Sequence, residues 1–265
     1  MNLLLHSPSN IVNPLARQRF MGFGTGSSGG ADFSPLSLAP LIWCDATRLA
    51  LNNGDPVAQF SDLSGNKYHY ISSGTARPTF VSNGIKGRPA IEGDGVDDAM
   101  TRAAIGEHLD WWAFIVAAPV TMGTAKELWA LNDFPQSIAI YRLLETNAAS
   151  TININQGVGL MSSSITLANG VCRAIRLEGH TTSVHYQADN GSPISKTGLT
   201  GNYPTTGNDG RLGNFVSGIF ARGGGTGLWF NARIGELVLG SGTLTSGQLT
   251  SMWTYLAQKW GTSIP

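Results

Sequence analysis

The sequence has few charged residues and no surplus of either sign. Of its 265 residues, 17 are Lys or Arg and 17 are Asp or Glu, so the formal net charge is zero. The charged fraction is 13%, whereas about a quarter is usual in soluble domains. Proteins that bind nucleic acid normally carry a basic surplus that displaces the counterions of the phosphates. The composition therefore argues against nucleic acid as a partner.

Cysteine and long apolar runs are also scarce. Cys44 and Cys172 are the two cysteines, without a CxxC motif or metal-ligand spacing, which argues against a disulfide framework and a zinc site. A single disulfide between them stays open. No apolar run reaches the roughly 18 residues that cross a bilayer, and the first 20 residues lack the basic start and unbroken apolar core of a signal peptide. We expect no membrane insertion and no export signal.

Glycine, in contrast, is abundant, and part of it lies in one tract. The 34 glycines amount to about twice the usual frequency. The segment GFGTGSSGGADFSP at 22–35 is too polar to bury surface that would offset the entropy of ordering it. We predict an extended N-terminal arm and Gly/Ser linker over 1–40 and one domain over 41–265. The arm residues predicted to anchor a partner are Leu3, Leu4, Ile11, Val12 and Phe20.

From Leu41 onward, short apolar or alternating runs recur between turn signals, a pattern typical of an all-β sandwich or barrel. The run Trp112–Ala117 is apolar on both faces, which predicts a central strand of a covered sheet. The pair Asn190-Gly191 tolerates positive φ and predicts a hairpin turn. The predicted strands are 41–44, 112–117, 127–131, 137–143, 151–155, 173–177, 183–188, 210–213 and 232–239.

One helix is predicted, at the C-terminus. Thr245 and Gln248 fit a capping box at its start, and Gly261 is suited to end it. Between them one apolar stripe recurs at spacings of four, three and four, which is typical of a helix packed on a domain. The stripe consists of Leu249, Trp253, Leu256 and Trp260.

Several ordered motifs together resemble the concanavalin A-like, laminin-G-like jelly-roll modules. The resemblance covers about 41–261 and implies a two-sheet jelly-roll sandwich with one C-terminal helix. Its middle, from about 100 to 230, is supported by strand-like patterning alone. The motifs are LIWCDA at 41–46, FSDLSGN at 60–66, RPTF at 77–80, GRPAI at 87–91, GDGVDD at 93–98, ARIGEL at 232–237 and YLAQKWG at 255–261.

Most motif residues favour structural roles. The large apolar side chains of Trp43, Trp229 and Trp260 are predicted to anchor a core. Residues 62–66 are predicted to form a turn in which short polar side chains bond their own backbone. His185 lies in a predicted strand, and we expect a hydrogen-bonded sheet residue there rather than a general base.

Four carboxylates, Glu92, Asp94, Asp97 and Asp98, form the sharpest chemical feature of the sequence. They favour a hydrogen-bonded loop, with a calcium ion held by Asp94, Asp97 and Asp98 as the alternative. Some glycosidases with this fold place carboxylates at alternate positions of a strand, but the pattern Glu-x-Asp-x-x-Glu is not completed because position 97 is Asp. We therefore predict no enzymatic activity and no cofactor other than calcium.

Two functions follow from the arm, the linker and the resemblance. The first is a bacteriophage virion structural protein (capsid decoration, head fibre, or tail or adsorption component) in which the arm attaches a homo-oligomeric jelly roll to other virion proteins. The alternative is a module that binds host or other cell-surface polysaccharide without catalysis, located outside or on the surface of a cell. In that alternative Trp111, Tyr203 and Phe215 are the aromatic residues predicted to stack on sugar rings.

Overall fold

Side-chain alternation along the strands shows how the sequence builds this fold. In the computed structural model, Ile175 and Leu177 belong to the core between two sheets, so the residues that alternate with them, Arg176 and Glu178, face the other side of their strand. The opposite partner of Glu178 on the neighbouring strand is Trp112, which packs in a second apolar layer. The structure describes residues 33–121, 126–133, 142–146, 151–156, 159–166, 168–189, 191–198, 216–221 and 227–265.

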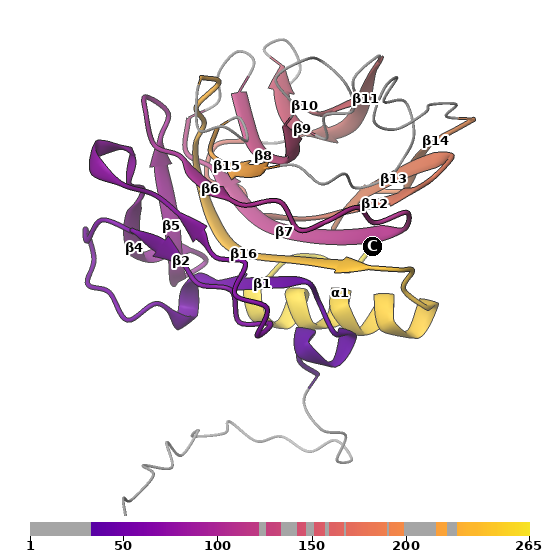
Figure 1. The fold of residues 1–265 in the computed structure, drawn as a ribbon, viewed down its shortest axis with the longest axis horizontal. Helices are drawn as coiled ribbons and strands as arrows, with labels where there is room; N and C mark the ends of the chain where they lie inside the picture. The colour runs from indigo at the N-terminus through magenta and orange to yellow at the C-terminus, as the bar shows by residue number, and fades with distance from the viewer. Residues whose placement is uncertain are drawn as a thin grey trace, which may run out of the picture. The chain divides into compact units, whose positions relative to one another are not determined.

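The first sheet, called sheet A, has eight strands that pair antiparallel (Figure 1). β1 pairs with β16 beside the main path of the sheet. In spatial order the main path is β14 (Ile194–Thr197), β13 (Ser183–Ala188), β12 (Arg173–His180), β7 (Trp111–Pro119), β16 (Asn231–Ser241), β5 (Arg88–Asp94) and β4 (Thr79–Ile85), and β1 spans Ile42–Asp45.

The second sheet, called sheet B, is also eight-stranded and antiparallel. Its order is β11 (Gly159–Thr166), β10 (Thr151–Gln156), β9 (Arg142–Thr146), β8 (Lys126–Asp133), β15 (Val216–Ile219), β6 (Met100–Arg102), β3 (Tyr70–Ile71) and β2 (Gln59–Phe60). The predicted all-β sandwich is confirmed. Strand 210–213 and most of 137–143 lie outside the described residues.

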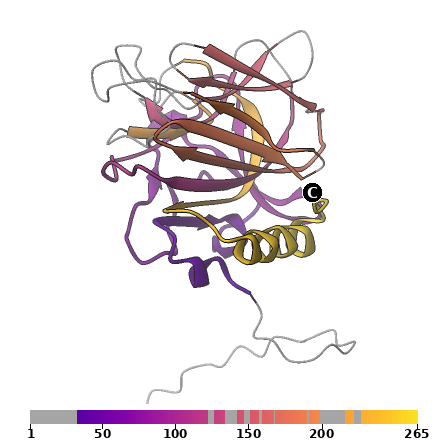
Figure 2. The ribbon, with the colours of Figure 1, turned by 90° about the vertical axis from the view of Figure 1, so that its right-hand side faces the viewer.

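Two apolar layers lie on the two faces of sheet A. One fills the space between the sheets and includes Trp111, Ile115 and Trp129. The other lies between sheet A and the helix α1 (Ser246–Trp260) and includes Phe114 and Trp253. Figures 1 and 2 show α1 beside β16 and β1, on the face of sheet A that is turned away from sheet B. β7 is buried along its whole length because both of its faces are covered.

The helix ends confirm the sequence-based prediction. The backbone N–H of Gln248 donates to Oγ1 of Thr245 over 3.3 Å, and the backbone N–H of Thr245 donates to Oε1 of Gln248 over 2.9 Å. Gly261 ends the helix with φ 63°, in the left-handed region that glycine adopts without steric cost.

Two glycines of β16 let tryptophan rings approach the backbone. A Cβ on Gly235 would lie 2.5 Å from Cη2 of Trp260, and a Cβ on Gly240 would overlap the ring of Trp112. Part of the glycine excess therefore serves close packing rather than turns.

The segment 33–40 belongs to the sandwich rather than to the predicted arm. The rings of Phe33 and Tyr255 lie 5.8 Å apart, and Leu38 packs against the layer beneath α1. Phe33–Pro265 form one compact unit, so its boundary falls before the predicted position 40. Short 3-10 helices span Pro35–Leu38, Ala46–Arg48 and Gly74–Ala76.

Cys44 and Cys172 are free, buried thiols, which answers the disulfide question left open by the sequence. Burial raises the pKa of both thiols, that of Cys172 to about 12. Among the described residues, no helix has the length and apolar character needed to span a membrane.

Candidate functional site

Three of the motifs that resemble the jelly-roll modules, at 41–46, 232–237 and 255–261, meet in a buried polar network between sheet A and α1. Glu236 is 1% exposed, and its carboxylate accepts hydrogen bonds from the indole N–H groups of Trp43 over 2.6 Å and of Trp260 over 2.7 Å. It also accepts from the hydroxyl of Tyr255 over 2.8 Å and lies 2.9 Å from Nζ of Lys259. Four groups thus satisfy one buried carboxylate, so the network fastens the helix to the sheet.

The predicted turn at 62–66 is confirmed, and its side chains form hydrogen bonds that hold the start of β1. The carboxylate of Asp62 accepts from the backbone N–H groups of Trp43, Ser64 and Tyr68 over 2.9, 2.9 and 3.0 Å. The hydroxyl of Ser64 donates to the carbonyl of Leu41 over 3.0 Å. This turn is therefore a structural brace for the start of the sandwich.

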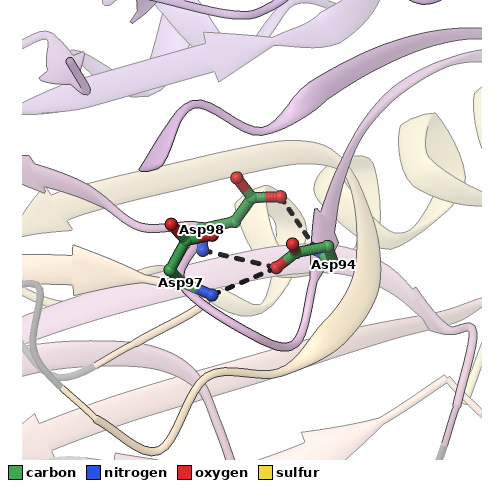
Figure 3. A group of neighbouring side chains, drawn as sticks. All are labelled: Asp94, Asp97 and Asp98. Atoms are coloured by element: carbon green, nitrogen blue, oxygen red, sulfur yellow. Dashed lines mark hydrogen bonds between the residues drawn. The ribbon is translucent and has the colours of Figure 1, made fainter. Parts of the chain in front are cut away.

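The loop that follows β5 brings the three predicted calcium ligands together (Figure 3). Oδ1 of Asp94 accepts from the backbone N–H groups of Val96, Asp97 and Asp98 over 2.8, 3.3 and 3.4 Å. Oδ2 of Asp98 accepts from the backbone N–H of Asp94 over 2.9 Å. The loop is thus held by its own hydrogen bonds, the arrangement that the sequence favours.

The same three carboxylates could also hold a metal ion, because their nearest oxygens lie within 4.8 Å of one another. Burial raises the pKa of Asp98 to about 6; the backbone hydrogen bond from Asp94 opposes this rise and the charges of Asp94 and Asp97 add to it. A cation would favour the ionised form. Calcium binding stays a prediction.

Glu92 does not join this loop. Its Oε2 lies 2.5 Å from Nε of Arg233 on the neighbouring strand. The alternation of Glu92 and Asp94 therefore yields an ion pair and a loop cap, rather than two carboxylates facing one substrate.

The predicted sugar-stacking role of Trp111 is wrong. The side chain is 0% exposed, in the core between the sheets, because it opens the buried strand β7 rather than lying in a loop. The other two predicted stacking residues, Tyr203 and Phe215, lie outside the described residues. So do the predicted anchors Leu3, Leu4, Ile11, Val12 and Phe20, and these roles stay predictions.

The predicted core role of three tryptophans is confirmed for two of them. Trp43 and Trp260 are buried in the apolar layer between sheet A and α1, whereas Trp229 is only half-buried. The indole nitrogen of Trp229 is shielded from solvent and has no hydrogen-bond partner in the described ranges.

A polar cluster on the outer face of β12–β14, beside the part of sheet A that α1 covers, was not predicted from the sequence. We call it the outer-face cluster. Outward polar residues are ordinary on a sheet face in contact with water, so the sequence pattern did not mark these residues as a site. A usable signal was the run of ionisable residues at every second position of β12. The cluster consists of Asp110, Arg176, Glu178, His180, Ser183, His185 and Ser195.

His180 stands between two carboxylates of this cluster. Its Nδ1 lies 2.8 Å from Oδ1 of Asp110, and its Nε2 lies 3.3 Å from Oε1 of Glu178. Arg176 pairs with the other oxygen of Glu178. A neutral imidazole carries one N–H and donates to one carboxylate only. The other carboxylate then keeps acceptor capacity that a ligand hydroxyl can use.

The other half of the cluster is built around His185. Its Nε2 lies 3.1 Å from Oγ of Ser183 and its Nδ1 lies 2.6 Å from Oγ of Ser195, as expected for a hydrogen-bonded sheet residue. Burial lowers the pKa of His185; the charge of Glu178 opposes this change, and His180 and Arg176 add to it. Nε of Arg176 is buried without a hydrogen-bond partner among the described residues. The cluster thus combines fixed acceptors with a donor that is not satisfied.

By its fold the chain is a two-sheet antiparallel β-sandwich protein with one C-terminal helix. No family model and no curated protein matches its sequence. Solved structures that are similar include a Trypanosoma rangeli sialidase in complex with a difluoro-KDN, with a TM-score of 0.58 and 11% identity, covering 89% of this chain and 35% of the sialidase. A GH54 α-L-arabinofuranosidase has a TM-score of 0.56 and 9% identity, covering 81% of this chain and 62% of that enzyme.

These comparisons correct two predictions. The similar structures are glycosidases, so the phage virion structural role and the prediction of no enzymatic activity are contradicted. Both predictions relied on an arm-like composition and an incomplete carboxylate pattern, which do not identify what the fold is used for. The chain spans about a third of the sialidases and less than two thirds of the arabinofuranosidases, and at this identity the likeness shows the fold.

Proposed function

We propose that this chain is a carbohydrate-recognition domain of the jelly-roll type, with the outer-face cluster as its binding surface. The observation that carries the proposal is the set of fixed acceptors and donors around His180, on a partly exposed area of the sheet face beside α1. The sandwich is shared with proteins that act on glycans, and this supports the ligand class.

The charges of the cluster favour a neutral glycan. Apart from its two imidazoles, the cluster has one cation, Arg176, and two carboxylates, Asp110 and Glu178, of which Asp110 is about half exposed with a side-chain exposure of 48%. An acidic sugar placed here would meet this negative excess at short range. Hydroxyl groups can instead donate to the carboxylate oxygens, which carry lone pairs beyond those used by His180.

Glycoside hydrolysis is the second candidate, and one observation favours it. Two carboxylates, from Asp110 and Glu178, contact opposite nitrogens of one imidazole, and glycosidases commonly use a pair of carboxylic acids as acid and base or nucleophile. On this proposal Glu178→Gln abolishes the release of sugar from a substrate, and an unchanged rate rules out this pair.

The binding proposal is tested on the purified chain with a broad array of neutral oligosaccharides, followed by calorimetry with any ligand found. We expect Glu178→Gln and His180→Ala to weaken binding about tenfold, the loss of one or two hydrogen bonds to a charged or polar partner. Glu92→Gln is the matched control, because this carboxylate also lies on sheet A and also pairs with an arginine, Arg233, but it stands outside the outer-face cluster. The absence of binding to every glycan, or an equal loss in Glu92→Gln, overturns the proposal.

A further inference from the structure

A small pocket with a cationic lining lies at the end of sheet A opposite the outer-face cluster. It has a volume of about 140 Å³ and is lined by the turn of the β4–β5 hairpin, the end of β7 and the segment before β12, with Lys86, Cys172 and Arg233 among its residues. The outer-face cluster contains Asp110, next to the start of β7, whereas the pocket lies at Pro119. The nine residues of β7 span eight steps of about 3.4 Å, which separates the two sites by roughly 27 Å.

Both cations of the pocket are positioned for a ligand. Nε of Arg233 donates to Oε2 of Glu92 over 2.5 Å, and its Nη1 donates to the carbonyl of Gly84 over 3.0 Å. These bonds fix the guanidinium plane and leave Nη2 without a hydrogen bond to the described residues. Lys86 is exposed and has neither an ion-pair partner nor a hydrogen bond within the described part of the chain.

The backbone at Lys86 adopts the left-handed conformation, which is uncommon for lysine. Ile85 pairs with Arg88 across the hairpin, so Lys86 and Gly87 form the two-residue turn, with φ 49° and 80°. Turns with two positive φ values favour Asn, Asp or Gly. A lysine in the left-handed region costs about 1–2 kcal/mol, and such strain gathers at binding sites.

The remaining ionisable groups leave the pocket positive. Burial raises the pKa of Cys172 to about 12, and the charge of Asp189 adds to this rise. The thiol is therefore neutral at physiological pH. Glu92 neutralises Arg233, so the charge of Lys86 stays uncompensated among the described residues.

We propose that this pocket binds a small oxyanion, such as a sulfate, phosphate or carboxylate group. Two cationic side chains line it, Lys86 from the hairpin turn and Arg233 from β16, and both phosphate and carboxylate are recognised by such groups. Its volume is below the 300–1,000 Å³ of pockets that enclose a whole ligand. The pocket therefore takes one anionic group, either a free ion or a substituent of a larger molecule.

The test is calorimetric titration of the full chain with inorganic sulfate, inorganic phosphate and an oligomer of glucuronate, with an uncharged glucose oligomer as reference. Lys86→Asn removes the cation and keeps a residue that tolerates the left-handed region. Lys67→Asn is the matched control, because Lys67 is also exposed and has φ 65°, but it does not line the pocket. We expect Lys86→Asn to weaken anion binding about tenfold and Lys67→Asn to leave it unchanged.

The outcomes separate the sources of the anion. Binding of the inorganic ions alone assigns the pocket to a free anion, and stronger binding of the glucuronate oligomer than of sulfate assigns it to an acidic substituent. No saturable binding of any of the three anions, or equal affinity in Lys86→Asn and the unmodified chain, overturns the proposal. Neither result bears on neutral glycans at the outer-face cluster, because the variants and ligands differ.

Discussion

The outer face of sheet A has two halves, which differ in how completely the hydrogen bonds of their polar groups are satisfied within the fold. Under α1, Glu236 is almost fully buried, and four groups from β1 and the helix satisfy its carboxylate. Beside the helix, the outer-face cluster is partly open, and His180 stands between two carboxylates. Within the part of the chain that the structure describes, the buried Nε of Arg176 has no hydrogen-bond partner.

The difference separates a stabilising network from a candidate binding surface. A buried charge is tolerated when its partners complete its hydrogen bonds, and the Glu236 network meets this condition. A cluster with a partly exposed acceptor, the carboxylate of Asp110, can bind a ligand hydroxyl without first losing an internal bond. We therefore expect variants of the first half to change stability and variants of the second to change binding.

The largest expected effect is that of Glu236→Ala. It leaves two indole N–H groups, one hydroxyl and one ammonium without their shared acceptor, and breaking a buried charge pair costs about 3–5 kcal/mol. Urea unfolding followed by tryptophan fluorescence measures the loss. A change below about 1 kcal/mol would show that water replaces the carboxylate and that the network does not hold the helix.

Gly235→Ala should cost less, about 1–3 kcal/mol, because the added methyl group would be forced against the ring of Trp260. Thermal unfolding by circular dichroism is the measurement. Gly247→Ala is the control, because a Cβ added to this helix residue would have nothing within 4 Å, and we expect a small gain of up to about 1 kcal/mol. Equal effects of the two substitutions would contradict the packing argument.

The loop after β5 predicts a pH dependence of stability. Because the pKa of Asp98 is raised from 3.8 to about 6, the folded chain holds a proton between about pH 4 and pH 6 that the unfolded chain releases. Stability should therefore fall as the pH rises through this window and level off above it.

Urea midpoints at pH 4, 5, 6 and 7 measure this slope, which we expect Asp98→Asn to reduce. Bound calcium would favour the ionised carboxylates, so millimolar calcium should reverse the slope if the loop binds the ion. The same slope in Asp98→Asn and the unmodified chain would contradict the assignment to Asp98.

The smallest effect on stability is expected for His180→Ala in the outer-face cluster. Of its two carboxylate partners, Asp110 is about half exposed, with a side-chain exposure of 48%, and the buried Glu178 keeps its ion pair with Arg176. Exposed ion pairs contribute about 0–1 kcal/mol. We expect a loss of at most about 1 kcal/mol in the urea experiment. A loss as large as that of Glu236→Ala would erase the distinction between the two halves.

Local patterns were enough to predict the sandwich, the helix and the turn at Asp62. The capping box of Thr245 and Gln248 and the alternation of β13 depend on neighbouring residues, and the structure contains both. The candidate site depends on strand pairing instead. Asp110 meets His180 across 70 positions of the sequence, and without the register of β7 against β12 their polar side chains look like ordinary surface residues.

The wrong prediction for Trp111 has a similar cause. The residue precedes an apolar run and could belong to a loop or to the strand, and the side of the sheet it faces follows from the pairing register. The function was more difficult to predict than the fold, because the motifs that could be recognised hold the fold together and lie outside the outer-face cluster.

The most direct test of the central claim is a titration of the isotope-labelled chain with a neutral oligosaccharide, followed by amide chemical shifts in a ¹H–¹⁵N spectrum. We predict saturable shifts at β12, β13 and Asp110, with little change at Trp260 and the rest of α1. Shifts confined to other parts of the chain, or none with any neutral glycan at millimolar concentration, would contradict the proposal that the open half of sheet A recognises carbohydrate.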